Sequence, residues 1–138
     1  MYAKVLVVED DPIIAFDIRQ YLADQNYTVI GVVPSGEQAL DKVHQSMPDI
    51  ILMDIKLKGS LNGIQTAKRI QDEFEIPIVF VSAYLSPFNL QKLNHLGPCK
   101  YLSKPFDNDQ LESNIQMALV QRKIENRLSA NQLTPTFN

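Results

Sequence analysis

The fold of this chain is decided by residues 50–54, Ile50-Ile51-Leu52-Met53-Asp54. Four consecutive apolar residues are typical of a strand that is covered on both faces, as in a parallel sheet. Because this run is the most apolar of the chain, we expect residues 50–53 to form the central strand. Asp54 follows at once, so its carboxylate is expected at the carboxyl end of a buried strand.

Apolar runs on either side of this stretch repeat the pattern. Further strands are predicted at residues 5–8, 28–33, 78–81 and 101–102, and an amphipathic helix follows each strand. Strand and helix thus alternate five times along the chain. This alternation predicts an α/β fold with a parallel sheet, right-handed crossovers and helices on both faces. The ligand site of such a sheet lies outside the carboxyl ends of its strands.

Polar residues stand at or just after the carboxyl ends of four of these predicted strands. In chain order they are Glu9 with Asp10, then Asp54, Ser82 and Lys104. Each has an ordinary interpretation by itself: an acid as a helix cap, Ser82 as a turn residue, Lys104 as a surface charge. Because the strand ends of a parallel sheet meet at one edge, we expect all of them to lie together, and the combination indicates a site.

The acidic members of this set suit a divalent cation. Close carboxylates repel one another, and a hard cation with oxygen ligands relieves that repulsion. We expect Mg²⁺ with Asp10 and Asp54 as direct ligands and Glu9 bound through a water. The backbone carbonyl of Lys56 could add another oxygen. The neighbouring Asp11 is interpreted as a helix N-cap in preference to a ligand.

Asp54 is the candidate nucleophile, because it follows the most apolar strand and carboxylates form aspartyl-phosphate intermediates. The ammonium of Lys104 would meet a phosphoryl oxygen, and Pro105 would fix the backbone beside it. The hydroxyl of Ser82 would donate a hydrogen bond once the phosphoryl group arrives. The set therefore predicts covalent phosphorylation of the chain.

Composition narrows the classes of protein further. The 138 residues suit one domain, and a net charge of -3 disfavours a nucleic-acid partner. No apolar run approaches the roughly 18 residues that span a bilayer, and no signal-peptide pattern precedes the first strand. The single cysteine, Cys99, excludes an internal disulfide. We expect a cytoplasmic domain without a membrane partner.

From Lys4 to about Gln121, the chain resembles the receiver domain of two-component response regulators, in the chemotaxis-type receiver family. The resemblance is carried by Glu9-Asp10, Asp54, Ser82 and Lys104-Pro105, while Tyr101 matches the family's switch aromatic. It implies a flavodoxin-like, doubly wound sheet of five strands in the order 2-1-3-4-5.

The resemblance also implies a mechanism. A sensor histidine kinase or a phosphotransfer protein would donate a phosphoryl group to Asp54 with Mg²⁺ bound. Ser82 and Tyr101 would then shift together and remodel the face formed by the fourth helix, fifth strand and fifth helix. The protein would be a signalling switch and not an enzyme, although such domains also catalyse their own dephosphorylation. Its output would pass to a partner or to a covalently linked output domain outside this sequence.

Two other functions stay open at this point. A Mg²⁺-dependent phosphohydrolase would use Asp54 as nucleophile, but usually carries a second acid two residues on, where this chain has Lys56. A degenerate receiver would bind partners without phosphorylation, which the presence of every key residue disfavours.

The predicted domain organisation is a receiver domain over residues 1–121 and a helical extension with a disordered tail over 122–138. An apolar stripe continues into the extension through Met117, Val120, Ile124 and Leu128. A linker helix is preferred to a frayed overhang. A helical pair in a homodimer is the third interpretation, since about two heptads are marginal for one. Residues from Leu133 onward are expected to be disordered.

Overall fold

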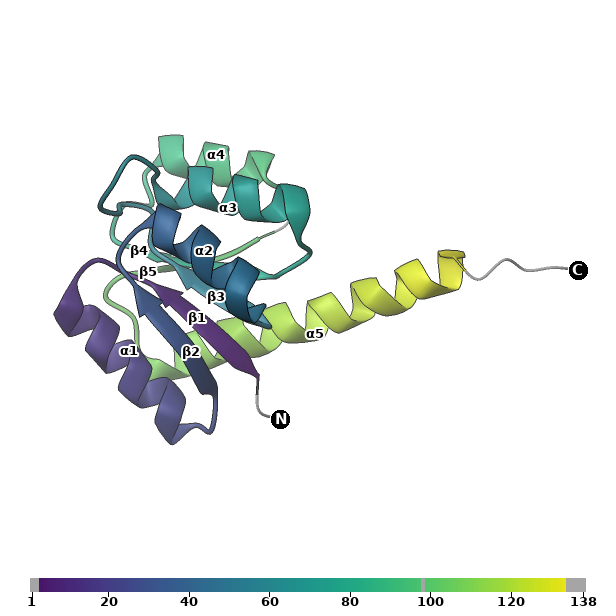
Figure 1. Cartoon of the computed structure of the whole chain (residues 1–138), viewed down its shortest axis with the longest axis horizontal. Coiled ribbons are helices and arrows are strands. Elements are labelled where there is room, and N and C mark those ends of the chain that lie inside the picture. The colour runs from purple at the N-terminus through teal and green to yellow at the C-terminus, as the bar shows by residue number, and fades with distance from the viewer. Residues whose placement is uncertain (1–2, 98, 134–138) are drawn as a thin grey trace, which may run out of the picture.

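The computed structural model describes residues 3–97 and 99–133 of the chain (Figure 1). Strands and helices alternate throughout this part. The strands are β1 (Lys4–Val8), β2 (Thr28–Val33), β3 (Ile50–Met53), β4 (Ile78–Ser82) and β5 (Lys100–Ser103). The helices are α1 (Pro12–Asp24), α2 (Gly36–Ser46), α3 (Gly63–Glu73), α4 (Pro87–His95) and α5 (Asn108–Leu133).

The strands form one parallel sheet in the order β2-β1-β3-β4-β5, which confirms the predicted α/β fold. β3 lies in the centre, and all four of its residues are buried. The last residues of neighbouring strands are paired, Val8 with Met53 and Ser82 with Ser103. The residues that follow these strands therefore leave the sheet at the same edge.

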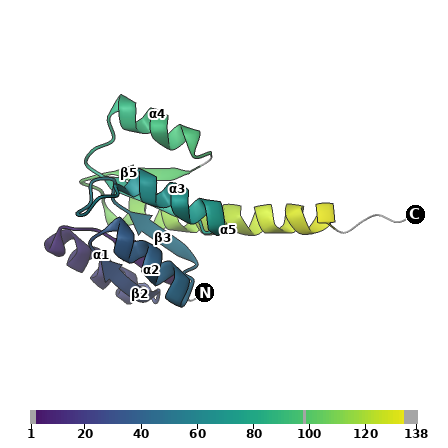
Figure 2. The same ribbon diagram turned by 45° about the horizontal axis from the view of Figure 1, so that its top comes forward.

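Helices cover both faces of the sheet (Figure 1). One face packs against α1 and α5 through a core that includes Ile18, Leu22, Leu111 and Ile115. The other face packs against α2, α3 and α4. The helix α4 packs weakly against the sheet, because Leu93 is its one fully buried residue. Figure 2 shows α4 standing apart from α3.

Side-chain caps fix where the helices begin. Asp11 accepts hydrogen bonds from the backbone N–H groups of Ile13 and Ile14, which confirms its interpretation as an N-cap. Ser35 and Asp107 accept hydrogen bonds from the backbone N–H groups of Gln38 and Gln110 and cap α2 and α5 in the same way. A further capping box, between Asn62 and Gln65, starts α3 and was not predicted.

The last helix, α5, runs well past the rest of the domain as a single rod (Figures 1 and 2). The prediction that it continues beyond residue 121 is confirmed. The four stripe residues, Met117, Val120, Ile124 and Leu128, are each more than half exposed. Leu133, expected in the disordered tail, is instead the last helical residue, and residues 134–138 lie outside the described part. Among the helices described, none is long and apolar enough to cross a membrane.

Gly63 lets α3 begin close to the Asp54 backbone. It is the first residue of α3, and its N–H donates to the Ile55 carbonyl at 2.6 Å. A Cβ at this position would lie 1.9 Å from the carbonyl oxygen of Asp54. The glycine therefore serves the close approach of α3 to the Asp54 backbone.

Candidate functional site

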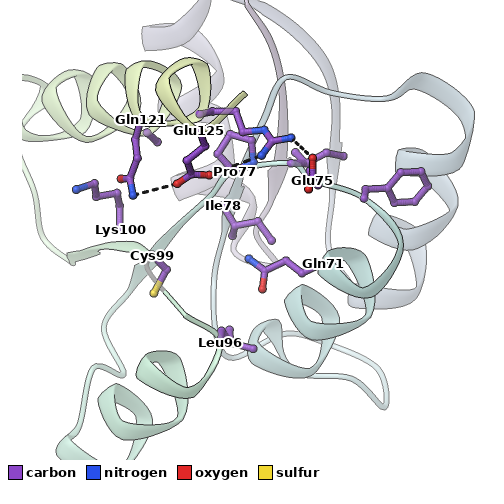
Figure 3. Close-up of a pocket in the computed structure, with 13 residues that line it drawn as sticks. Gln71, Glu75, Pro77, Ile78, Leu96, Cys99, Lys100, Gln121 and Glu125 are labelled. Carbon is purple, nitrogen blue, oxygen red and sulfur yellow. Dashed lines mark hydrogen bonds and ion pairs between the residues drawn. The ribbon is translucent and has the colours of Figure 1, made fainter. Parts of the chain in front are cut away.

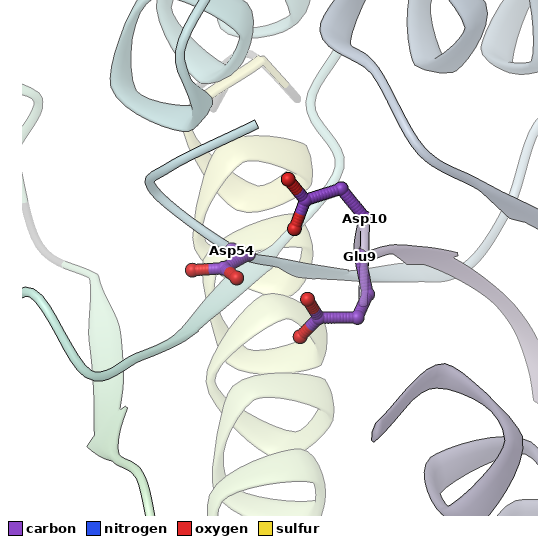
Figure 4. Close-up of side chains that lie close together, drawn as sticks. All are labelled: Glu9, Asp10 and Asp54. Carbon is purple, nitrogen blue, oxygen red and sulfur yellow. The ribbon is translucent and has the colours of Figure 1, made fainter. Parts of the chain in front are cut away.

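The carboxyl edge of the sheet brings three acids together: Glu9, Asp10 and Asp54 (Figure 4). Each offers a carboxylate oxygen, and these oxygens all lie within 4.8 Å of one another. Two backbone hydrogen bonds hold the edge, from Glu9 N to the Val33 carbonyl and from Asp54 N to the Val8 carbonyl, both at 2.9 Å. The predicted convergence of these acids is confirmed as geometry.

Lys104 reaches this cluster from the loop after β5. Its Nζ donates to Oδ2 of Asp54 at 2.9 Å and also to Oε1 of Glu9. The lysine is held there because its backbone N–H donates to the Ser82 carbonyl at 3.1 Å. One ammonium thus bridges two carboxylates that are only about 5% exposed, which offsets part of their repulsion.

Burial and these contacts shift the proton affinities of the site. Burial raises the pKa of Glu9 from 4.5 to about 7, although its hydrogen bond with Lys104 acts in the opposite direction. Burial alone would lower the pKa of Lys104, but its bonds to Glu9 and Asp54 outweigh burial, and the pKa lies above 10.5. The ammonium is therefore charged at neutral pH, beside a carboxyl group that is costly to ionise without a cation.

Ser82 connects the site to α4. Its side chain is fully buried, and its Oγ accepts a hydrogen bond from the backbone N–H of Tyr84 at 3.0 Å. The carbonyl of Tyr84 in turn accepts from the side chain of Asn89, in the first turn of α4. Tyr101, the predicted switch aromatic, lies on β5 with 42% of its surface exposed. Sequence reasoning missed Asn89, because its hydrogen bond depends on the conformation of the loop before α4, which no local sequence pattern indicates.

The loop after Asp54, which carries Lys56, is tied to the start of α2. Oε2 of Glu37 accepts from both the backbone N–H and the hydroxyl of Ser60, each at 3.1 Å. Gly59 has a φ of +91°, in the region that favours glycine, and faces the same carboxylate. The side chain of Lys56 is exposed, with its amine 5.0 Å from the ring centre of Tyr84. Glu37 therefore fixes this loop, and sequence reasoning missed it.

A separate pocket of about 240 Å³ lies at the opposite end of the sheet (Figure 3). It is formed by the end of α3, the starts of β4 and β5, and α5. Arg122 donates to Glu75 at 2.6 Å across it, and Gln121 donates to Glu125 at 3.3 Å. Cys99 lies in its wall, and burial raises the pKa of this thiol. The ion pair ties the outer part of α5 to the domain.

The donor set at the acidic cluster fits Mg²⁺. Carboxylate oxygens from Glu9, Asp10 and Asp54 are hard ligands at one small site, and Asp10 is the most accessible of the three. Mg²⁺ keeps several waters when it binds to proteins, so a partly open cluster suits it better than a closed cage.

Comparison with known proteins agrees with this site. The model of the response regulator receiver domain family matches residues 5–116. The transcriptional regulatory protein DltR of Streptococcus agalactiae is 32% identical over 131 residues, which is 94% of this chain and 56% of DltR. The transcriptional regulatory protein PdtaR of Mycobacterium tuberculosis is 28% identical over 116 residues, 84% of this chain and 56% of PdtaR. The chain thus spans about half the length of the curated relatives it matches.

Solved structures give the same result. The signal receiver domain of a modulated diguanylate cyclase from Desulfovibrio desulfuricans superposes with a TM-score of 0.85 and 35% identity, over 91% of this chain and 99% of that one. The BeF3-activated receiver domain of RstA from Klebsiella pneumoniae gives a TM-score of 0.77 and 28% identity, over 84% and 97%.

The chain belongs to the response regulator receiver domain family. The predicted flavodoxin-like sheet is confirmed by the receiver structures. Receiver domains are signalling switches of two-component systems, and Mg²⁺ binding and phosphorylation are typical of them. The narrower chemotaxis-type assignment stays a prediction.

Proposed function

We propose that this chain is a phosphorylation-dependent switch that accepts a phosphoryl group on Asp54 from a sensor histidine kinase or a phosphotransfer protein. The observation that carries the proposal is the contact of Lys104 with both Glu9 and Asp54 beside the acidic cluster. At the carboxyl edge of the sheet, the three carboxylates suit a cation and the single ammonium suits a phosphoryl group beside it. The cytoplasm is the proposed compartment.

In the proposed reaction, a carboxylate oxygen of Asp54 attacks the phosphorus of the donor's phosphohistidine. The bond from that oxygen to phosphorus forms, and the phosphorus–nitrogen bond breaks with its electron pair going to the imidazole nitrogen. Glu9, Asp10 and Asp54, with the Lys56 carbonyl, would hold Mg²⁺, which supplies charge neutralisation to the phosphoryl oxygens. Lys104 would exchange its bond with Asp54 for one with a phosphoryl oxygen.

The proposed response begins at Ser82. Its hydroxyl would turn toward the phosphoryl group and give up its bond with the Tyr84 N–H, releasing the segment that leads to α4. Tyr101 would then move from its exposed position toward the space near Ser82. The face formed by α4, β5 and α5 would change, because α4 is weakly packed and its position depends on this segment.

We further propose that residues 1–121 form the receiver domain and that the rest of α5 is a linker helix. The exposed stripe on α5 would contact an output domain outside this sequence, or the same stripe of a second chain in a homodimer. The longer relatives, of which this chain matches 56%, support the linker interpretation.

Intact mass after incubation with acetyl phosphate tests the proposal. One phosphoryl adduct is expected in the presence of Mg²⁺, and none is expected with a chelator or in Asp54→Asn. Adduct formation in Asp54→Asn at the wild-type level would assign the chemistry to another residue. Steady release of phosphate without an adduct would instead favour a hydrolase.

A further inference from the structure

A groove of about 420 Å³ lies between α3 and α4. The ribbons of these two helices stand apart in Figure 2. Its apolar part is formed by Leu61, Ile64 and Leu96. Leu61 and Ile64 are each 8% exposed, while Leu96 is half-buried. Most of the aliphatic surface that the groove leaves open is therefore that of Leu96, which an apolar side chain could cover.

Cationic side chains stand along both sides of this groove. Lys68 and Arg69 come from α3 and Lys92 comes from α4, and all three are exposed. No acidic residue is among those that line the groove in the described part of the chain. Asp72 pairs with Lys68 at 2.7 Å, whereas Arg69 and Lys92 make no ion pair with a described residue. The groove is thus a positive surface on a chain whose net charge is -3.

The lining distinguishes between anionic ligands. The imidazole of His95 is the one aromatic ring in the described lining, and no Phe, Tyr or Trp there offers a nucleotide base a larger face to stack on. The start of α3 is also unsuited to a phosphate, because the Asn62 side chain already accepts from the Gln65 N–H at 2.8 Å. An aliphatic floor between flexible cations is suited to a peptide that carries both carboxylates and apolar side chains.

We infer that the groove between α3 and α4 is a docking surface for an acidic segment of a partner protein. A leucine-like side chain of this segment would lie on Leu96, beside Leu61 and Ile64, and its carboxylates would meet Arg69 and Lys92. The inference goes beyond the proposed phosphorylation and does not depend on it.

Such an occupant would also act on α4. It would contact α3 and α4 together, while α4 has little else to hold it, with Leu93 as its one fully buried residue. The first turn of α4 is joined to Ser82 through Asn89 and Tyr84. Binding in the groove and the position of Ser82 are therefore mechanically connected, and each would bias the other.

Amide NMR shifts of the unphosphorylated chain provide the test. The probe is a synthetic peptide of glutamate and leucine, compared with a matched peptide in which glutamine replaces every glutamate. Shift changes are expected on α3 and α4 around Ile64 and Lys92 with the acidic peptide. The double variant Arg69→Glu/Lys92→Glu is expected to weaken binding about tenfold, because two attractive charges become repulsive.

The matched control is Lys123→Glu/Arg127→Glu, which makes the same change in net charge on exposed positions of α5. It is expected to bind the acidic peptide as the wild type does, and the amide spectrum of each variant reports that it is folded. Equal weakening in both double variants, equal binding of the glutamine peptide, or shifts confined to another face would overturn the inference. Binding of ADP in the groove more tightly than the peptide would overturn the class of partner. The peptide is added to the unphosphorylated chain with no Mg²⁺ and no phosphoryl donor present, so failure of the proposed phosphorylation would not alter this result.

Discussion

Gly63→Ala tests how closely the start of α3 is fitted to Asp54. The new Cβ would lie 1.9 Å from the Asp54 carbonyl oxygen and 2.9 Å from the Cα of Ile55. Both are backbone atoms, so no flexible side chain can move away. Reaching ordinary contact at about 3.4 Å requires a displacement of about 1.5 Å between α3 and the Asp54 backbone.

We expect this change to lower the free energy of unfolding by about 1 to 3 kcal/mol, the usual range for overpacking of a tight interior. We also expect phosphorylation by acetyl phosphate to slow about a hundredfold, because a misplacement of about 1 Å is enough for that loss. Urea unfolding measures the first effect, and the rate of adduct formation by mass spectrometry measures the second.

Gly31→Ala is the matched control. Its Cβ would meet the Cε atom of Lys42 at 2.9 Å, and this atom belongs to a flexible side chain that can move aside. The control should stay within about 0.5 kcal/mol of wild type and keep its phosphorylation rate. If Gly63→Ala behaved like Gly31→Ala in both assays, the close fit between α3 and Asp54 would matter neither for stability nor for phosphorylation.

Three other predictions follow from contacts of the site and its surroundings. Lys104→Met should slow phosphorylation about a hundredfold, because a phosphoryl oxygen loses its cation, and an unchanged rate would contradict this role. Glu37→Ala should free the loop after Asp54 and weaken Mg²⁺ binding several-fold, as measured by calorimetry, whereas Glu37→Gln should keep part of the hydrogen bonding to Ser60. Equal Mg²⁺ affinity in wild type and both variants would refute the positioning role of Glu37. The pKa of His44 lies above 6.5, mainly because one ring nitrogen bonds the Leu40 carbonyl and secondly because the other bonds Glu73. Folding therefore favours the charged form of His44, so this stabilisation is complete below about pH 6 and is lost as the pH rises through the folded pKa. The melting temperature of Glu73→Gln should fall less between about pH 6 and pH 8 than that of wild type. Identical pH profiles in the two proteins would contradict this prediction.

The parts of the fold that sequence could predict are those with a local signal. The apolar run Ile50–Met53 indicated a central strand, and β3 is central and buried. The convergence of Glu9, Asp54 and Lys104 was also predictable, because parallel strands deliver their carboxyl ends to one edge.

Contacts between separate loops and helices were beyond such prediction. Glu37 and Ser60 are 23 residues apart, and neither stands in a pattern that indicates their hydrogen bonds. His44 and Glu73 are 29 residues apart, and their contact, which joins α2 to α3, has no local signal either. The need for glycine at position 63 comes from the approach of α3 to the Asp54 backbone, which no local sequence pattern indicates.

The identity of the phosphorylated residue is the central claim, and reduction of the phosphorylated chain with borohydride tests it most directly. Borohydride converts an aspartyl phosphate into homoserine, which peptide mass spectrometry can locate in the sequence. The account predicts homoserine at position 54 after treatment with acetyl phosphate and Mg²⁺, and none without Mg²⁺. Homoserine at Asp10 or Asp11 in place of Asp54 would contradict the proposed phosphoacceptor, as would its absence from a chain that carries the phosphoryl mass.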